Sequence, residues 1–195
     1  MKILELYNRL DKLLPPLDIE GIDSDGIHTL PDPDREVKKV LIALDPYEKA
    51  VGEAVRGGYD VLITPPPLFW GEPLPNTPPE NWYNRLMKAG VASFSFHIRL
   101  DKIEGGVNDI LAEILGLRDA KPFGEGDLGR IRTLDEELTM EDFSYLLKGL
   151  LDCDGVKVSD ACIPVTRVAV VGGDGKDFVK EALRLGADTF VSGRI

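Results

Sequence analysis

The sequence predicts an α/β protein made of two similar layers or subdomains, each built on a mostly parallel or mixed sheet. Short apolar runs typical of buried strands alternate along the chain with segments of helical periodicity. The second half also repeats the strand–helix–strand order of the first. We therefore expect an N-terminal α/β domain over residues 1–118 and a second α/β domain over 119–195. The second is expected to be incomplete at its C-terminus, because its last strand runs to the chain end.

The first half contains two strand–helix units. Helical periodicity covers residues 2–14 and stops at a pair of prolines, and a polar connection over 17–36 follows. A buried strand is expected at 37–45. The helix after it starts at Pro46 and stops at two glycines, and the next strand is expected at 59–64.

Residues 65–79 form what we call the proline-rich loop. Its seven prolines exclude regular structure over most of its length. Thr77 and Glu80 have the spacing of a capping box, which opens a helix that ends at Gly90. A third strand is expected at 91–97.

Large apolar side chains in the proline-rich loop predict self-association. They are Leu68, Phe69, Trp70 and Leu74. Uncovered, they would expose more apolar surface than a monomer usually keeps, and open strand edges would add unpaired backbone groups. We therefore expect a homo-oligomer with a dimer as its minimal unit.

The second half follows the same logic. A helix at 107–116 precedes a glycine-rich segment at 122–130, and Thr139 caps the helix that follows. The remaining expected elements are a short strand at 156–160, a strand at 166–173, a helix at 176–186 and a strand at 188–195.

Two segments have the same sequence shape in the two halves. GGYDVLIT and GADTFVSG each follow a helix that ends at glycine, and each places an aspartate directly before an apolar strand. Loops after the carboxyl ends of such strands are where α/β proteins build their sites.

Composition excludes several classes of protein. The chain has 195 residues, a 43% hydrophobic fraction and a net charge of −11, which argues against bulk binding to nucleic acid or to an anionic membrane. No apolar run reaches the length of a membrane span, and the N-terminus is not a signal peptide. With only two cysteines, the sequence predicts a cytoplasmic protein.

Three minor candidates each have a plain structural explanation. The GGDG segment at 172–175 is a candidate phosphate cradle or simply a tight turn. His28, near Asp23 and Asp25, is a candidate ligand, although an exposed loop histidine is the simpler interpretation. Phe69 and Trp70 are a candidate stacking platform for a base, or an apolar plug or subunit contact.

Several segments together resemble the Nif-three-like family, whose members are also called dinuclear-metal-centre proteins or type-two GTP cyclohydrolases. In chain order they are VLIALD, GYDVLIT followed by PPPL, SFSFHIRLD, GGVNDILAEILGL, GDLGRI and RVAVVGGDGKDFVKEALRLGADTFVSG. The resemblance covers most of the chain. Its most specific pieces run from His97 to Asp101, from Gly105 to Asp109 and from Val168 to Gly175.

The resemblance implies two α/β domains around a central cleft with a pair of divalent metals at its base. The family's ligands are a His pair after the second strand, a His and an Asp spaced by four after the third, and a His and a Glu after the last. His97 and Asp101 match the third-strand ligands, whereas Pro65 and Pro66 stand where the His pair would be. The last pair would follow residue 195, and Arg194 replaces an acidic residue of the family pattern.

The ligand chemistry limits what such a site can do. A catalytic zinc takes about three protein ligands and a water, and proline offers no side-chain donor. His97 and Asp101 supply two ligands, so we expect sub-stoichiometric zinc, manganese or iron. The structural alternative makes His97 a hydrogen-bonded histidine at a strand end and Asp101 a loop or capping carboxylate.

Two functions from different classes remain open. The first is a non-catalytic or weakly metal-binding assembly module with a degenerate metal site, and the missing ligands favour it. The second is a metal-dependent, GTP cyclohydrolase-like hydrolase of a nucleotide or phosphate ester. In that enzyme Asp101 is the catalytic residue that orients the attacking water, and a small nucleotide is the ligand.

Overall fold

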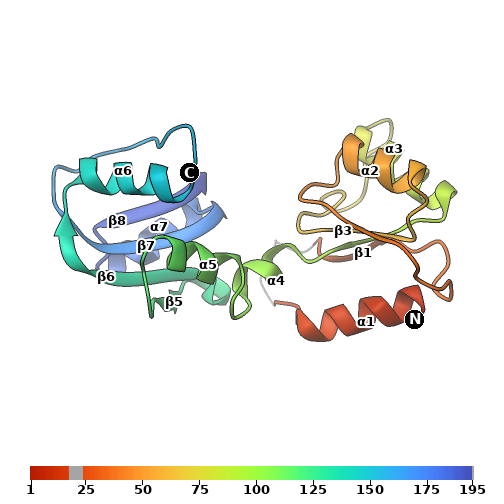
Figure 1. Ribbon diagram of the computed structural model, residues 1–195, viewed down its shortest axis with the longest axis horizontal. Helices are drawn as coiled ribbons and strands as arrows, with labels where there is room; N and C mark the ends of the chain where they lie inside the picture. Colours follow the sequence, from red (N-terminus) through yellow and green to blue (C-terminus); the bar gives the residue numbers. More distant parts are fainter. Residues whose placement is uncertain (18–23, 195) are drawn as a thin grey trace. The chain divides into compact units, whose positions relative to one another are not determined.

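The structure is a computed structural model that describes residues 1–17 and 24–194. The chain forms two compact units, Met1–Leu100 and Asp101–Ile195 (Figure 1). Each unit has its own four-stranded mixed sheet and its own hydrophobic core, so the predicted α/β class with two similar layers is confirmed.

The first unit holds four helices and four strands among the described residues, and its last helix crosses into the second unit. In chain order they are α1 (Ile3–Leu13), β1 (Gly26–Thr29), β2 (Val40–Ile42), α2 (Glu48–Arg56), β3 (Val61–Thr64), α3 (Pro78–Ala89), β4 (Ala92–Ser95) and α4 (His97–Lys102).

The first sheet has the strand order β1-β4-β3-β2. Strands β2, β3 and β4 are parallel, and β1 is antiparallel to β4. Helix α1 covers one face, where Ile3 packs with Val61 and Phe94, and helices α2 and α3 cover the other, where Val51 packs with Leu62 (Figure 1). The alternation of Val61 and Leu62 between two cores explains why the run from Val61 to Ile63 is apolar.

The second unit contains the remaining elements of the described chain. They are α5 (Val107–Ile114), β5 (Lys121–Phe123), the 3-10 turn η1 (Glu125–Asp127), β6 (Gly129–Leu138), α6 (Met140–Leu150), β7 (Val165–Asp174), the 3-10 turn η2 (Lys176–Phe178), α7 (Val179–Arg184) and β8 (Thr189–Arg194).

The second sheet has the order β5-β6-β7-β8, in which only β7 and β8 are parallel. Val168 and Val170 pack with α5 and α6, where Ala112 and Phe143 lie in the same core. Ala169 faces the other way, into a core that α7 completes. Because α5 packs on this sheet, residues 101–118 lie in the second unit, whereas the sequence placed the division after residue 118.

Three strands, β1, β5 and β6, were missing from the sequence prediction. Strand β1 lies inside the polar connection 17–36, β5 overlaps the start of the glycine-rich segment 122–130, and β6 begins at the end of that segment. In β1 and β6 polar residues interrupt the apolar pattern, and β5 is only three residues long. The strand expected at 156–160 is wrong, because these residues form no regular element.

The strand expected at 37–45 is also shorter and more exposed than predicted. It covers only Val40–Ile42 and lies at one end of the sheet order. Ile42 is 75% exposed and Leu44 79% exposed. An edge position leaves an apolar strand only partly covered, which periodicity alone does not reveal.

Two helix ends follow the capping rules that the sequence suggested. The Thr139 hydroxyl accepts a hydrogen bond from Asp142 N at the start of α6. Gly90 ends α3 in the left-handed conformation, with φ of 74°.

The capping box expected at Thr77 does not form, because Thr77 donates from its hydroxyl to Leu74 O and Glu80 accepts from Asn76 N. Helix α2 begins at Glu48 and not at the expected Pro46. None of the helices in the described residues combines the length and apolar character needed to cross a membrane.

Candidate functional site

The candidate site lies at the edge of the first sheet where parallel strands β3 and β4 end. Pro65 follows β3 and His97 follows β4 after one intervening residue. Antiparallel β1 starts at the same edge, since Gly26 pairs with Ser95. The sheet therefore brings the start of β1 together with the two chain segments that the resemblance singles out.

His97 is held at the start of α4 by its backbone and its ring. Its N–H donates a 2.8 Å hydrogen bond to the Asp25 carboxylate. Its ring meets Trp70 edge-on, with 5.2 Å between ring centroids. Nδ1 of His97 is buried and has no hydrogen-bond partner among the described residues. One nitrogen of this ring therefore remains available to an additional group.

Asp101 follows His97 by four residues in α4, one turn along the helix. The division between the two units falls directly before it. The four-residue spacing of His97 and Asp101, noted in the sequence, therefore corresponds to one turn of a helix. The roles of His97 and Asp101 as metal ligands stay predictions.

Arg99, between these two residues, is a buried cation that belongs to the framework of the first unit. Its guanidinium donates to the Asp11 carboxylate at 2.7 Å and to Leu14 O at 3.1 Å. Its Nε lies 3.3 Å from the Asp25 carboxylate, an ion pair rather than an aligned hydrogen bond. Burial alone would lower the pKa of Arg99, but these acidic partners outweigh burial and raise it. Asp25 therefore links the start of β1 to α4 by two contacts.

The residues at the end of β3 form a closed turn. Ser95 donates from its hydroxyl to Pro65 O at 2.7 Å, and Thr64 donates from its hydroxyl to Pro66 O at 2.8 Å. The side chains of Pro65 and Pro66 are hydrocarbon and carry no donor atom. Among the residues that the structure describes, no three His, Cys, Asp or Glu side chains gather closely enough to hold a metal ion.

His28 lies in β1 and is half-buried, so the expectation of an exposed loop histidine is wrong. Its Nε2 is buried and has no hydrogen-bond partner in the described chain. Its ring meets Phe69 edge-on at 4.9 Å. Burial disfavours the charged imidazolium and lowers the pKa of His28 to about 4. Asp25 is turned toward α4, and Asp23 lies outside the described residues.

The proline-rich loop thus places one aromatic side chain against each of the two histidines of the chain. Phe69 contacts His28 and Trp70 contacts His97, and Gly71 N donates to the Ser24 hydroxyl at 2.9 Å. The loop is less exposed than the sequence predicted, because Leu68 is buried and Phe69 half-buried.

Two of the four large apolar side chains of the proline-rich loop remain largely exposed. Trp70 is 59% and Leu74 69% exposed. They line a groove of about 560 Å³ whose wall also includes Tyr47 and Trp82. Six prolines line the groove, and none of them has a backbone N–H to donate.

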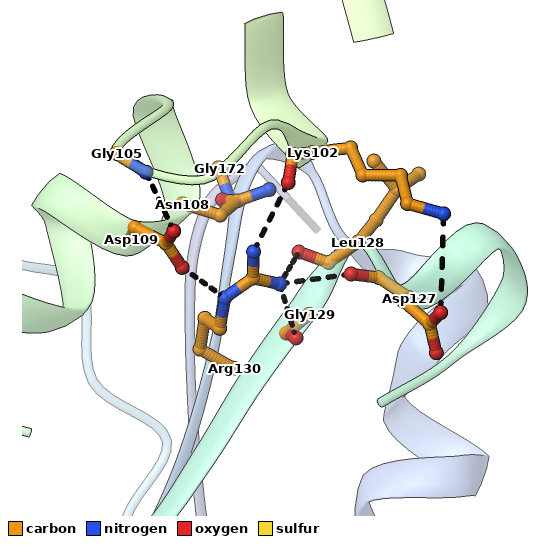
Figure 2. Close-up of polar contacts among 9 residues, drawn as sticks. All are labelled: Lys102, Gly105, Asn108, Asp109, Asp127, Leu128, Gly129, Arg130 and Gly172. Atoms are coloured by element: carbon orange, nitrogen blue, oxygen red, sulfur yellow. Dashed lines mark hydrogen bonds and ion pairs between the residues drawn. The ribbon is translucent and has the colours of Figure 1, made fainter. Parts of the chain in front are cut away.

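The Gly-Gly-Val-Asn-Asp motif builds a polar hub inside the second unit (Figure 2). Asp109 accepts from Gly105 N at 2.9 Å and forms an ion pair with Arg130. Asn108 accepts from Gly172 N at 2.7 Å, which ties α5 to β7. The Gly-Gly-Val-Asn-Asp motif, one of the most specific pieces of the resemblance, therefore stabilises the second unit through these contacts.

Arg130 is the centre of this hub and is only 7% exposed. Besides Asp109, its guanidinium donates to four backbone carbonyl groups, those of Lys102, Asp127, Leu128 and Gly129 (Figure 2). Burial alone would raise the pKa of Asp109, but Arg130 and the Gly105 N–H outweigh burial and lower it. A buried charge with this many partners is well satisfied.

The GGDG segment is engaged internally. Gly175 N donates to the Ser192 hydroxyl at 2.9 Å and to Arg194 O at 3.1 Å. Asp174 pairs with Lys176, and Gly173 has φ of 65°. The N–H of Gly175, one of the backbone groups that could face a phosphate, therefore bonds to β8. The tight-turn interpretation accounts for these glycines.

Comparison with known proteins agrees with the sequence resemblance. The profile of the family described as Duf34/NIF3 (NGG1p interacting factor 3) matches residues 1–195. A Clostridium perfringens protein named GTP cyclohydrolase 1 type 2 homolog is 30% identical over 203 residues, covering 99% of this chain and 77% of that protein. A Streptococcus pneumoniae protein of the same name is 30% identical over 174 residues, covering 83% of this chain and 65% of its own.

Solved structures give the same result. Staphylococcus aureus protein SA1388 has a TM-score of 0.81 and 27% identity, covering all of this chain and 80% of its own. Reduced HcgD from Methanocaldococcus jannaschii has a TM-score of 0.80 and 28% identity, covering all of this chain and 79% of its own. The predicted family is confirmed: this chain belongs to the DUF34/NIF3 family.

Proposed function

We propose that this protein is a non-catalytic assembly module of its family, whose site on α4 binds at most one divalent ion per chain, weakly. The observation that carries the proposal is the closed turn at the end of β3. There Pro65 and Pro66 stand where the resemblance places a pair of histidines.

The ligand chemistry supports a degenerate site. Pro65 and Pro66 offer no side-chain donor in place of the His pair of the pattern, and His97 and Asp101 are the two ligands of the pattern on α4. The orphaned Nδ1 of His97 suits one weakly held ion, with waters completing its shell. The residues at this edge do not fit a two-metal centre, because the prolines supply no donor atoms.

Assembly is supported by the apolar surface that the first unit exposes. Ile42, Leu44, Trp70 and Leu74 are each more than half exposed. A symmetric assembly uses such surfaces and requires no catalytic group. The free thiols Cys153 and Cys162 are consistent with a reducing cytoplasm as the place where the module works.

The second candidate is a metal-dependent hydrolase of a nucleotide or phosphate ester. It is favoured by the name GTP cyclohydrolase 1 type 2 homolog of the relatives. In it Asp101 would orient the attacking water, and a small nucleotide would be the ligand. The metal supplies electrophilic activation when bound.

Metal content tests the proposal. Protein purified without chelator is analysed for zinc, manganese and iron, together with a P65H/P66H variant and a matched P73H/P75H control. We expect less than one ion per chain in the wild type and more in P65H/P66H, with no gain in P73H/P75H. The control makes the same changes farther along the proline-rich loop. Nearly two ions per wild-type chain, lost in H97A, would overturn the proposal.

A further inference from the structure

We propose that two copies of this chain join through the free edge of β2, in an antiparallel pairing centred on Ile42. The inference rests on the proposed assembly function and names the surface that assembly uses. Its basis is the position of β2 in the sheet, the exposure of its side chains and the self-complementary order of residues 39–45.

The backbone of β2 presents hydrogen-bonding groups at an open edge. Among the described strands, β2 is the last in the order β1-β4-β3-β2. Lys39 O accepts from Asp60 N at 2.8 Å, and Ala43 N donates to Ile63 O at 3.0 Å. Strand hydrogen bonds alternate in direction, so the odd-numbered residues bond to β3. Even-numbered residues 40–44 therefore turn their N–H and C=O groups to the open edge.

Side chains of the same even-numbered residues form an exposed apolar row. Val40 is 37%, Ile42 75% and Leu44 79% exposed. These side chains share one face of the strand because successive residues alternate. Helix α1 packs on that face, but its core contains residues of β3 and β4 and none of β2 (Figure 1). The side chains of Val40, Ile42 and Leu44 are therefore not part of the core under α1 and stay exposed at the edge of the sheet.

Strand β2 lacks the features that usually prevent an edge strand from pairing with another chain. Natural edges are blunted by proline, by a charge within the strand or by a bulge. Residues 40–44 read Val-Leu-Ile-Ala-Leu and contain neither proline nor charge, and β2 pairs with β3 in unbroken register.

An antiparallel pair of β2 strands centred on Ile42 would match both the outward backbone groups and the apolar side chains of residues 40–44. Ile42 then faces Ile42 of the second copy, and Val40 faces its Leu44, so both apolar rows join on one face of the sheet. Each of these pairs has its backbone groups turned inward to the other strand, as hydrogen-bonded pairs require. Lys39 would face Asp45, both exposed, which adds opposite charges at each end.

A second copy fits better at this edge than in the groove of the proline-rich loop. That groove is also apolar, but its prolines carry no backbone N–H and cannot extend a sheet. Residues 39–45 combine apolar, hydrogen-bonding and charge complementarity with themselves. A two-fold interface requires this self-complementarity.

The first experiment measures mass at micromolar concentration by light scattering and sedimentation, for wild type, I42K and the matched control L74K. Wild type is expected at twice 21.5 kDa or more. In I42K two like charges meet at the two-fold axis, and we expect at least a 10-fold higher concentration to be needed for association. L74K adds the same charge to another exposed leucine and should associate as wild type does. Circular dichroism verifies that both variants fold.

The second experiment tests the register by disulfide formation in a C153S/C162S background. Opposite residues in a hydrogen-bonded pair lie about 5.5 Å apart between Cα atoms, within disulfide range. I42C should therefore cross-link two chains under mild oxidation. L44C should not, because the two Leu44 positions would be four residues apart along the strands.

The outcomes separate this inference from the function on which it rests. An oligomer that I42K leaves intact, with no cross-link in I42C, overturns the β2 interface while assembly stands. A mass of 21.5 kDa that does not change with concentration overturns assembly itself, and the β2 interface with it.

Discussion

Asp60 and Asp188 occupy equivalent positions in the two units. The carboxylate of Asp60 accepts hydrogen bonds from the N–H groups of Lys38 and Lys39, at 2.7 and 2.8 Å. The carboxylate of Asp188 accepts from those of Thr166 and Arg167, at 3.0 and 2.7 Å. In both cases the donors precede the aspartate by 22 and 21 residues. Each aspartate therefore fastens the start of one parallel strand to the start of its neighbour.

We expect both aspartates to make stability dependent on acid. Burial alone would raise the pKa of each, but their hydrogen bonds outweigh burial and hold both pKa values below the ordinary 3.8. Their contribution is therefore full above about pH 4 and is lost as pH falls through the lower folded-state values. D60N and D188N should each lose about 1–3 kcal/mol at pH 7 and show a flatter acid dependence.

Urea unfolding at pH 7 and pH 3 measures this effect. The control is D135N, whose carboxylate is 87% exposed and pairs only at the surface. D135N should change stability by about 0.5 kcal/mol or less. If the free energy of unfolding of D60N and D188N falls between pH 7 and pH 3 by as much as that of the wild type, these aspartates are not the source of the acid dependence.

His28 should make the protein less stable as pH falls from about 6.5 to 4. Burial lowers the folded-state pKa of His28 from 6.5 to about 4, so the unfolded chain takes up a proton first. H28L removes a buried nitrogen that has no partner, so it should be neutral or stabilising at pH 7. It should also remove part of the stability loss near pH 5.

Nuclear magnetic resonance identifies the group directly, because the chain has only two histidines. The imidazole resonance that disappears in H28L belongs to His28 and should titrate near pH 4. A titration of that resonance near pH 6.5 would contradict the buried position.

Asp109 should be important for the stability of the second unit. D109N leaves the guanidinium of Arg130, which is 7% exposed, without its counter-charge. Because Asp109 is itself about one-third exposed, we expect a loss of about 2 kcal/mol, below the cost of breaking a fully buried pair. Hydrogen exchange should accelerate in β6 and β7. The control is D135N, which removes the ion pair between Asp135 and Arg132 in the same unit and should leave the hydrogen-exchange rates near those of the wild type. If D109N and D135N change the exchange rates equally, the role of Arg130 as a hub is wrong.

GTP turnover should be at background in this protein, and added zinc or manganese should not increase it. The reason is the shortage of ligands at the α4 site, where two prolines replace two histidines of the pattern. Liquid chromatography of the nucleotide products measures the rate. Robust metal-dependent turnover that D101N abolishes would instead establish the hydrolase, because this near-isosteric change removes the carboxylate charge.

The sequence by itself determined the fold class and much of the local structure. Strand runs such as 166–173, the caps at Thr139 and Gly90 and the repeated Gly-x-Asp-strand pattern depend on local preferences that act within a few residues. Contiguous motifs likewise identified the family, above all the segment from His97 to Asp109. The sequence also showed that proline stands where metal ligands were expected.

Only the tertiary structure decided which surfaces are covered. Periodicity marked 37–45 as a buried strand, but burial depends on the neighbours that the sheet order supplies, and β2 is an edge strand. The sequence prediction also missed β1 and β6, because polar residues interrupt their apolar pattern, and β5, which is only three residues long. Long-range contacts also turned His28 inward against Phe69 and made Arg130 a hub. Such contacts join residues far apart in sequence, so no local pattern encodes them.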